Sequence, residues 1–273
     1  MTEMIEIAVL MTVHNRKSTT IKCLKYLYAN NLEGYQYQVY LVDDASTDGT
    51  ADAVQKKFPM VKIIHGNGEL YWNRGMIKAW EEAAKDEPDF YLWLNDDTML
   101  FGNALSIMVA SYKETDGNSI ICGSTMALDS DEITYGGRMS HKLVIPNGKL
   151  QKIEWINGNC VLVPRIVKEK IGILDPYFRH AKGDWEYGVR ALKNGIMVYS
   201  ATDYVGRCAA HEKKTPKYYD ANYSLKERLD FLYHPLGASP KETYYYCKKC
   251  FRLGRLRAFA YITLTYLKVL FTK

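Results

Sequence analysis

The sequence predicts an α/β protein with a mostly parallel central sheet flanked by helices. Over the first hundred residues, short apolar runs alternate with amphipathic segments of helical length, and polar residues follow the ends of these runs. A helix between two strands returns the chain to the same edge of the sheet, so this order gives parallel strands. With 273 residues, 47% of them hydrophobic, the chain can bury one large core.

The expected elements alternate regularly up to residue 94. The expected strands are Ile5–Thr12, Tyr37–Val42, Val61–His65 and Phe90–Leu94. The helices expected between them are Lys17–Ala29, Ala51–Lys57 and Arg74–Lys85. The first helix is indicated by apolar side chains at helical spacing, and the second ends before Pro59. Together they form a β-α-β-α-β-α-β series.

The pattern is looser after residue 100. The expected helices are Leu105–Tyr112, Ile166–Ile171 and Asp184–Asn194, and the expected strands are Ser119–Gly123, Trp155–Val163 and Ile196–Ser200. The turn-rich stretch 129–152 suggests a hairpin or an excursion near a site. From Leu225 onward the chain is aromatic, basic and helical.

Two adjacent carboxylates, Asp96 and Asp97, follow the apolar run Phe90–Leu94. Open α/β sheets bind ligands at the carboxyl ends of their strands. Two like charges at such a place suggest a divalent cation, because hard oxygen ligands suit Mg²⁺ or Mn²⁺. The alternative is that Asp97 or Thr98 caps the next helix while Asp96 is solvated.

Four segments form one pattern when taken together. They are VLMTVHNR at 9–16, LVDDASTDGT at 41–50, LWLNDDT at 92–98 and GDWEYGVR at 183–190. In this order and spacing they resemble the family 2 glycosyltransferases, which have the GT-A nucleotide-diphospho-sugar transferase fold. The resemblance covers about residues 5 to 212. It is greatest to bacterial enzymes that build cell-surface polysaccharides, some of which transfer rhamnose or galactofuranose.

The resemblance implies a nucleotide pocket at the ends of the first strands. Asp43 and Asp44 end the second strand, where a carboxylate can accept hydrogen bonds from ribose hydroxyls or a uracil imide. By resemblance the pocket also contains Thr12, Asn15, Arg16, Arg74 and Asp96. The alternative for Asp43 and Asp44 is a place in a turn.

The segment 95–97 occupies the position of the family's DxD motif, with Asn95 in place of the first acid. The resemblance makes Asp97 the main ligand of Mn²⁺ or Mg²⁺, and leaves open whether Asp96 touches the metal or a ribose. His211 is implied as a third ligand. The cation would stabilise the departing nucleoside diphosphate as a Lewis acid.

Asp184 aligns with the general base of the family. An inverting transfer needs one carboxylate that removes the acceptor's proton as its hydroxyl attacks the anomeric carbon. Glu186 is the second candidate for this role, and the alternative for Asp184 is a helix N-cap.

Sugar and acceptor contacts are expected in two further places. By resemblance Trp72 and Asn73 border the donor. Asn157, Gly158 and Asn159 form a glycine-broken segment that permits close approach of the backbone to a sugar. The aromatic face of Trp185 could form part of the wall that binds the acceptor or the donor sugar, or the ring could belong to the core.

A zinc site is a competing interpretation of the cysteines. Cys208 and His211, with Cys247 and Cys250, have a spacing that a Cys₃His site allows. Against this, the second pair falls in a helical segment. Six cysteines at irregular spacing, without an export signal, favour reduced thiols and a cytoplasmic location.

The tail differs in charge from the rest of the chain. From Lys241 onward the net charge is +7, against +5 for the whole chain, so the first 240 residues carry −2. The first 240 residues therefore lack the excess of basic residues that is typical of nucleic-acid-binding proteins. Lys248, Arg252 and Arg255 recur at helical spacing, which favours a basic amphipathic helix on the inner face of the cell membrane. Packing of this helix on the domain, or a homodimer, is the alternative.

These observations divide the chain into a GT-A domain over 1–222 and a basic aromatic helical tail over 223–273. Within the domain, 1–100 is the nucleotide-binding half and 101–222 the acceptor and catalytic half. The predicted activity is inverting, metal-dependent transfer of a hexosyl or deoxyhexosyl group from a UDP- or dTDP-linked donor to a hydroxyl of a surface glycan, expected to be lipid-linked. The rival functions are sugar-1-phosphate nucleotidyl transfer and non-catalytic binding of a nucleotide sugar.

Overall fold

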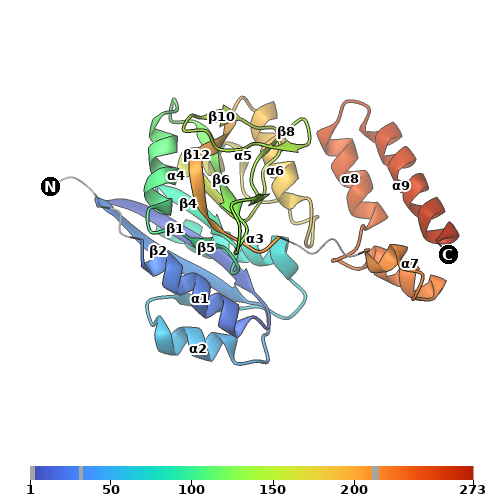
Figure 1. Cartoon of the computed structure of the whole chain (residues 1–273), viewed down its shortest axis with the longest axis horizontal. Coiled ribbons are helices and arrows are strands. Elements are labelled where there is room, and N and C mark those ends of the chain that lie inside the picture. Colours follow the sequence, from blue (N-terminus) through green and yellow to red (C-terminus); the bar gives the residue numbers. More distant parts are fainter. Residues whose placement is uncertain (1–3, 31–32, 211–214, 273) are drawn as a thin grey trace.

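The computed structural model describes residues 4–30, 33–210 and 215–272. A mixed sheet in the order β10-β12-β6-β11-β4-β1-β2-β3 runs through the middle of the molecule, with helices on both sides (Figure 1). This arrangement confirms the predicted α/β class. A cluster of C-terminal helices lies at one end of the sheet domain, as predicted.

The first half of the sheet is parallel. Its strands are β1 (Ile5–Val13), β2 (Tyr35–Asp43), β3 (Lys62–His65) and β4 (Phe90–Leu94). The helices between them are α1 (Lys17–Tyr28), α2 (Thr50–Lys57) and α3 (Tyr71–Ala83), and α3 continues into the 3-10 turn η1 (Ala84–Asp86). β1 pairs in parallel with both β2 and β4, so the predicted series is confirmed element by element.

The second half of the sheet mixes parallel and antiparallel strands. Its strands are β5 (Met99–Leu100), β6 (Ser119–Met126), β7 (Ile133–Tyr135), β10 (Gln151–Lys152), β11 (Cys160–Pro164) and β12 (Met197–Arg207). β11 lies antiparallel between β4 and β6, whereas β6 and β12 are parallel to each other. The short strands β8 (Arg138–Met139) and β9 (Lys142–Leu143) form the predicted hairpin.

The strand expected at Trp155–Val163 was placed too early. β11 begins only at Cys160, because the preceding residues leave the sheet and use their polar groups for contacts at its edge. The strand expected at Ile196–Ser200 was placed too short, since β12 continues to Arg207.

Side chains of alternating residues enter two separate cores. In β1, Val9 and Met11 face one side of the sheet while Ala8 and Leu10 face the other. The first core is covered by α1, α2 and α4 (Ala104–Lys113), and the second by α3, α5 (Arg165–Ile171) and α6 (Gly183–Lys193). Because α3 and α6 share one face, the N-terminus of α6 is brought beside α3 and the edge of the sheet.

The C-terminal segment consists of η2 (Lys217–Tyr219), α7 (Leu225–Tyr233), α8 (Pro240–Cys250) and α9 (Gly254–Phe271). A capping box at Ser224 and Glu227 starts α7, and Ser239 caps α8. α8 packs against α6, and α9 packs on α8. Within the described ranges, no helix has the length and apolar character needed to cross a bilayer.

Candidate active site

The candidate site lies at one edge of the sheet, where the strand directions bring several chain segments together. The carboxyl ends of β1, β2 and β4 meet at this edge because these strands are parallel. β11 runs the opposite way, so the loop that precedes it, residues 157–159, arrives at the same edge. The backbone N–H of Asn95 donates to the carbonyl of Asn159 at 3.0 Å, which joins the end of β4 to this loop.

Arg16 bridges the two carboxylates that follow β4. Its Nε lies 2.8 Å from Oδ2 of Asp96, and its Nη2 lies 2.9 Å from Oδ2 of Asp97. Thr20 also donates to Asp96, at 3.2 Å. Burial raises the pKa of Asp96 to about 6; Arg16 opposes this shift and Asp97 adds to it. Two like charges are therefore held side by side by one guanidinium at the start of α1.

Asp97 is the more accessible carboxylate of the pair. Its side chain is 31% exposed, against 9% for Asp96. The thiol of Cys208, just after β12, lies 3.6 Å from Oδ1 of Asp97. Burial and the nearby Asp97 raise the pKa of this thiol to about 12, so it stays protonated and acts as a donor. Part of the Asp97 carboxylate is therefore accessible from solvent, as is required of a carboxylate that binds a metal ion.

A chain of contacts leads from Asp97 to Asp184. Asn159 Nδ2 lies 3.4 Å from the Cys208 sulfur, and the neighbouring Gly158 donates its N–H to Oδ2 of Asp184 at 3.1 Å. The loop 157–159 therefore touches the surroundings of both carboxylates. The two predicted key residues lie at the same edge of the sheet.

Asp184 begins α6 and is held by backbone donors. Its Oδ1 accepts the N–H of Trp185 at 2.8 Å, and its Oδ2 accepts that of Gly158. Burial raises the pKa of Asp184 to about 6, against the direction of these hydrogen bonds. A carboxylate with a raised pKa is a better proton acceptor than an ordinary aspartate and remains ionised at neutral pH. Asp184 is thus a carboxylate fixed by backbone donors and basic enough to accept a proton.

Three residues predicted for the nucleotide pocket lie at or just after the ends of β1 and β2. Asp43 is buried and accepts the N–H of Ser46 at 2.9 Å on Oδ1. Asn15 takes a left-handed conformation, with φ of 52°, and its Oδ1 accepts the N–H of Thr47 at 2.7 Å. Thr12, the penultimate residue of β1, lies against Gly75 of α3, where an added Cβ would approach the Thr12 Oγ1 to 2.1 Å. The ends of β1 and β2 are therefore tied together beside the Asp96–Asp97 pair.

Asp44 has a structural role in the loop that leads into α3. Its Oδ1 accepts the N–H of Gly68, and its Oδ2 accepts those of Leu70 and Tyr71, at 2.7–3.1 Å. Both oxygens are used by the loop that leads into α3. The placement in a turn, weighed as the alternative, describes Asp44 better than a nucleotide contact.

Three aromatic and amide side chains border the carboxylates. Trp72 donates its indole N–H to Oδ1 of Asn95 at 2.7 Å, and its ring packs so closely on Gly158 that a Cβ there would approach it to 2.5 Å. Asn157 accepts the N–H of Asn159 on its side chain. Trp185 is 39% exposed and meets the edge of Trp155. The site thus has indole surfaces on two sides.

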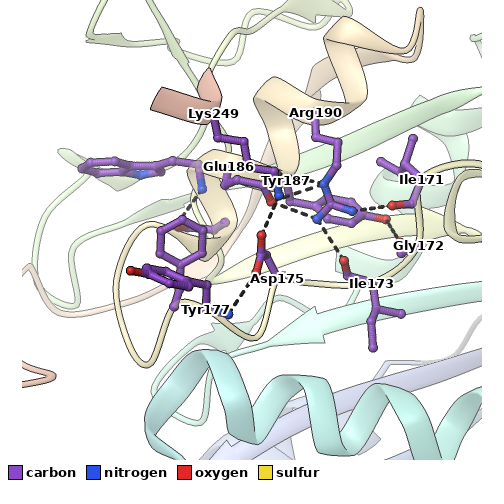
Figure 2. Close-up of polar contacts among 12 residues, drawn as sticks. Ile171, Gly172, Ile173, Asp175, Tyr177, Glu186, Tyr187, Arg190 and Lys249 are labelled. Carbon is purple, nitrogen blue, oxygen red and sulfur yellow. Dashed lines mark hydrogen bonds and ion pairs between the residues drawn. The ribbon is translucent and has the colours of Figure 1, made fainter. Parts of the chain in front are cut away.

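Glu186 does not share the environment of Asp184. It is 1% exposed, and its carboxylate is paired with Arg190 at 2.9 Å and with Lys249 at 2.8 Å, as Figure 2 shows. An acid neutralised by two cations and shielded from solvent is unsuited to accept a substrate proton. The prediction that it can act as a base is corrected by this placement.

Asn73 and Arg74 also lie elsewhere than predicted. Asn73 is fully buried and donates from Nδ2 to the carbonyls of Asp175 and Phe178, both at 2.9 Å. Arg74 donates to the carbonyl of Pro176 at 3.2 Å. Both side chains hold the loop that precedes α6, so they support the site from outside instead of touching a sugar or a diphosphate.

The predicted third metal ligand, His211, lies outside the described residues. In the described ranges, no three His, Cys, Asp or Glu side chains form a metal-binding group. Cys208 contacts Asp97, whereas Cys247 and Cys250 pack in an apolar cluster with Phe178. This packing gives the cysteine pair of α8 a core role and argues against the zinc interpretation.

The residues at hand suit a divalent cation that is held mainly by its substrate. Mg²⁺ and Mn²⁺ are commonly bound through one or two carboxylates together with the phosphates of a nucleotide. Asp97, with the more buried Asp96 beside it, supplies this donor set next to Arg16. Two carboxylates are enough for such an ion, so the donor chemistry fits.

The sequence prediction missed several residues of the site. Cys208 was considered only as a zinc ligand, and Thr20 and Cys23 were given no part, although Cys23 donates to the carbonyls of Asn95 and Thr98. These side chains lie 72 to 111 residues from their partners. Their residue types, cysteine and threonine on buried faces, carry no signal of this role.

The model of the family described as "Glycosyl transferase family 2" matches residues 8–213. The chain belongs to this family, and it is therefore a glycosyltransferase. The match confirms both the resemblance and the enzyme class predicted from the four motifs. No curated protein matched the sequence.

Solved structures show the same fold at low identity. S. aureus TarS 1-349 in complex with UDP-GlcNAc is 13% identical with a TM-score of 0.61, over 97% of this chain and 80% of that one. The mannosyltransferase PcManGT from Pyrobaculum calidifontis, in complex with GDP-Man and Mn²⁺, is 13% identical with a TM-score of 0.60, over 97% and 72%. GalNAc-T7 with UDP, GalNAc and Mn²⁺ is 13% identical with a TM-score of 0.58, over 89% and 50%. These likenesses confirm the GT-A fold.

Proposed function

We propose that this glycosyltransferase moves a sugar, with inversion, from a nucleoside-diphosphate donor to a hydroxyl of a glycan acceptor. The observation that carries the proposal is the shared loop 157–159, which contacts Asp184 directly and reaches Asp97 through Cys208. An inverting displacement needs a leaving-group site and a base on opposite sides of one sugar. We assign Asp97 and Asp184, which this loop and Cys208 link, to these two places.

In this proposal Asp97, with Asp96, holds Mn²⁺ or Mg²⁺ together with the donor's diphosphate. When bound, the ion supplies Lewis-acid stabilisation of the departing nucleoside diphosphate. Mn²⁺ is present in the structures of PcManGT and GalNAc-T7, which supports a divalent ion here. Arg16 lies beside both carboxylates and adds positive charge at the place where the diphosphate develops its negative charge.

Asp184 takes the acceptor proton in the same step. Its hydrogen bonds from Gly158 and Trp185 fix the carboxylate at the start of α6, while burial raises its pKa to about 6. The oxygen of the acceptor attacks the anomeric carbon, the bond to the diphosphate breaks, and the proton goes to Asp184. The indoles of Trp72 and Trp185 provide flat apolar surfaces for the sugar rings.

Asp43 and Asn15 are proposed to bind the nucleoside. Asp43 is buried at the end of β2 and uses only Oδ1 in the hydrogen bond from Ser46. TarS and PcManGT are seen with UDP-GlcNAc and GDP-Man respectively, so a nucleotide sugar is the proposed donor for this chain as well, with a UDP- or dTDP-linked sugar expected from the motifs. Membership of the family favours sugar transfer over nucleotidyl transfer and over binding without catalysis.

The acceptor is proposed to be lipid-linked and reached at the inner face of the cell membrane. One face of α9, with Leu253 just before the helix, exposes large apolar side chains to solvent: Leu253, Leu256, Phe259, Leu264, Leu267, Leu270 and Phe271. Arg252, Arg255, Arg257 and Lys268 are exposed beside it, and no acidic residue follows Glu242. We name this surface the α9 face.

An anionic lipid surface matches the α9 face in both charge and polarity. Apolar side chains insert at the acyl boundary while flanking arginines and lysines pair with the headgroups. A symmetric contact between two copies would bring like charges together, which disfavours a homodimer through this face. Contact with the membrane would keep the enzyme next to a lipid-linked acceptor.

Release of a nucleoside diphosphate tests the proposed reaction. The purified protein is incubated with UDP-, dTDP- and GDP-sugars and Mn²⁺, first for donor-dependent thermal stabilisation and then with lipid-linked acceptors. The expected product is a nucleoside diphosphate in amounts equal to the sugar transferred. Release of pyrophosphate from a nucleoside triphosphate and a sugar 1-phosphate would instead establish the rival activity.

A further inference from the structure

Lys249 of α8 joins two carboxylates that belong to the segment carrying Asp184. Its Nζ lies 2.5 Å from Oδ2 of Asp175 and 2.8 Å from Oε1 of Glu186. Figure 2 shows Lys249 reaching toward Asp175 and Glu186, with Arg190 on the other side of Glu186. Burial alone would lower the pKa of Lys249, but Asp175 and Glu186 raise it, so the ammonium stays charged.

Glu186 depends on these cations because it is removed from solvent. It is 1% exposed and lies two residues after Asp184 in α6. Arg190, one helical turn further on, pairs with it and also donates to the carbonyls of Ile171 and Ile173. A buried carboxylate that loses a partner must take up water or a proton, or move. The first turn of α6 is therefore sensitive to the position of Lys249.

The loop before α6 is held from two directions. On one side, Asn73 of α3 donates to the carbonyls of Asp175 and Phe178. On the other, Arg179 pairs with Glu242 of α8 at 2.7 Å. Lys249 adds a contact to Glu186, which lies two residues after Asp184 in the sequence. Gly183, between the loop and α6, lies against Asn73 so closely that a Cβ would come within 1.7 Å of its Oδ1.

We propose that Lys249 is a positioning residue for Asp184. It ties the loop at Asp175 to the first turn of α6 at Glu186, and in this way sets where the base lies relative to Gly158. The C-terminal helices are then part of the catalytic apparatus, although none of their residues is assigned to substrate. The inference rests on the proposed role of Asp184 as the base.

Positioning has a kinetic signature that differs from that of a general loss of structure. The donor-binding carboxylates lie at the ends of β2 and β4, away from α8, so donor KM is expected to change less than twofold. Displacement of the base by a fraction of an ångström lowers kcat, since errors of 1 Å can cost about 10²-fold. We expect about a tenfold fall in kcat for Lys249→Met.

The experiment compares Lys249→Met and Lys249→Arg with Lys248→Met, which removes an exposed lysine from the same helix. Thermal unfolding is measured alongside kcat and KM. A fall in kcat with KM retained, restored in part by arginine and absent in Lys248→Met, supports the proposal. Unchanged kcat in Lys249→Met overturns the proposal. The proposal is also overturned if a smaller fraction of folded protein accounts for the whole loss of activity. If Lys249→Met does not fold, Asp175→Asn, which removes the other end of the bridge, is judged by the same criteria.

Asp184→Asn, measured in parallel, separates this inference from the proposed function. An inactive Asp184→Asn with a fully active Lys249→Met rejects only the positioning role. A fully active Asp184→Asn rejects the base, and with it the inference.

Discussion

Gly158 donates its backbone N–H to Asp184 at 3.1 Å, and no side chain at position 158 stands between the loop and the carboxylate. The next residue, Asn159, contacts Cys208, which in turn contacts Asp97. The geometry of the site therefore depends on three consecutive residues that precede an antiparallel strand. Each prediction below concerns one part of this arrangement.

Asp184→Asn is expected to lower kcat by about 10²- to 10⁴-fold, the usual contribution of a general base. Asparagine keeps the shape of the side chain and can still accept the Gly158 N–H, but it cannot take a proton. Nucleoside-diphosphate affinity, measured by calorimetry, is expected to stay within twofold. Turnover at the wild-type rate would remove Asp184 from the mechanism.

The rate should fall on the acid side of neutrality. The pKa of Asp184 is raised to about 6, and only the ionised form can accept a proton, so kcat is expected to drop tenfold for each pH unit below about 6. The measurement is kcat at saturating donor between pH 5 and 8, with folding checked by circular dichroism at each pH. A rate independent of pH down to 5 would show that the base is another group or has an ordinary pKa.

Asp97→Asn is expected to remove the dependence of nucleoside-diphosphate binding on Mn²⁺. A neutral amide is a weaker ligand for a hard cation, so the gain in affinity on adding Mn²⁺ should largely disappear. Calorimetry with and without chelator measures this gain, and Asp52→Asn, an exposed acid of α2, is the control. Equal affinity of the wild-type protein with and without the cation would contradict the metal proposal.

Gly158→Ala is expected to impair both stability and turnover. The added methyl would approach the ring of Trp72 to 2.5 Å, so either the indole or the loop must move. Overpacking of this kind costs about 1–3 kcal/mol. Gly102→Ala, where a Cβ meets nothing within 4 Å, should change the free energy of unfolding little. Urea unfolding of both variants makes the comparison, and identical midpoints would show that the Trp72 contact is loose.

The α9 face should bind vesicles that contain anionic lipid and bind neutral vesicles much less. Introducing aspartate at both Leu256 and Leu264 is expected to abolish co-sedimentation with phosphatidylglycerol vesicles, because it places charge on the apolar surface. Ile145→Asp, at an apolar side chain that is 61% exposed elsewhere, is the control. Loss of a dimer in sedimentation velocity, with vesicle binding unaffected, would assign the face to a second copy of the chain.

Much of the fold could be predicted because it depends on local pattern. The alternation of apolar strands with amphipathic helices defines the parallel half from β1 to β4, and the four motifs indicate the family. The carboxylates Asp96, Asp97 and Asp184 were recognisable because each follows or begins a regular element. The local pattern could not predict the direction of β11, because that direction depends on pairing with β4 and β6.

The sequence by itself determined the class of the protein and the position of its chemical groups along the chain. The tertiary structure decided the surroundings of each group: it placed Asp184 against Gly158, but enclosed Glu186 between Arg190 and Lys249 and used Asp44 and Asn73 to hold loops. The physical reason is that burial and charge pairing depend on partners far away in sequence. Lys249 lies 74 residues from Asp175, and nothing in the local sequence of either residue predicts their contact.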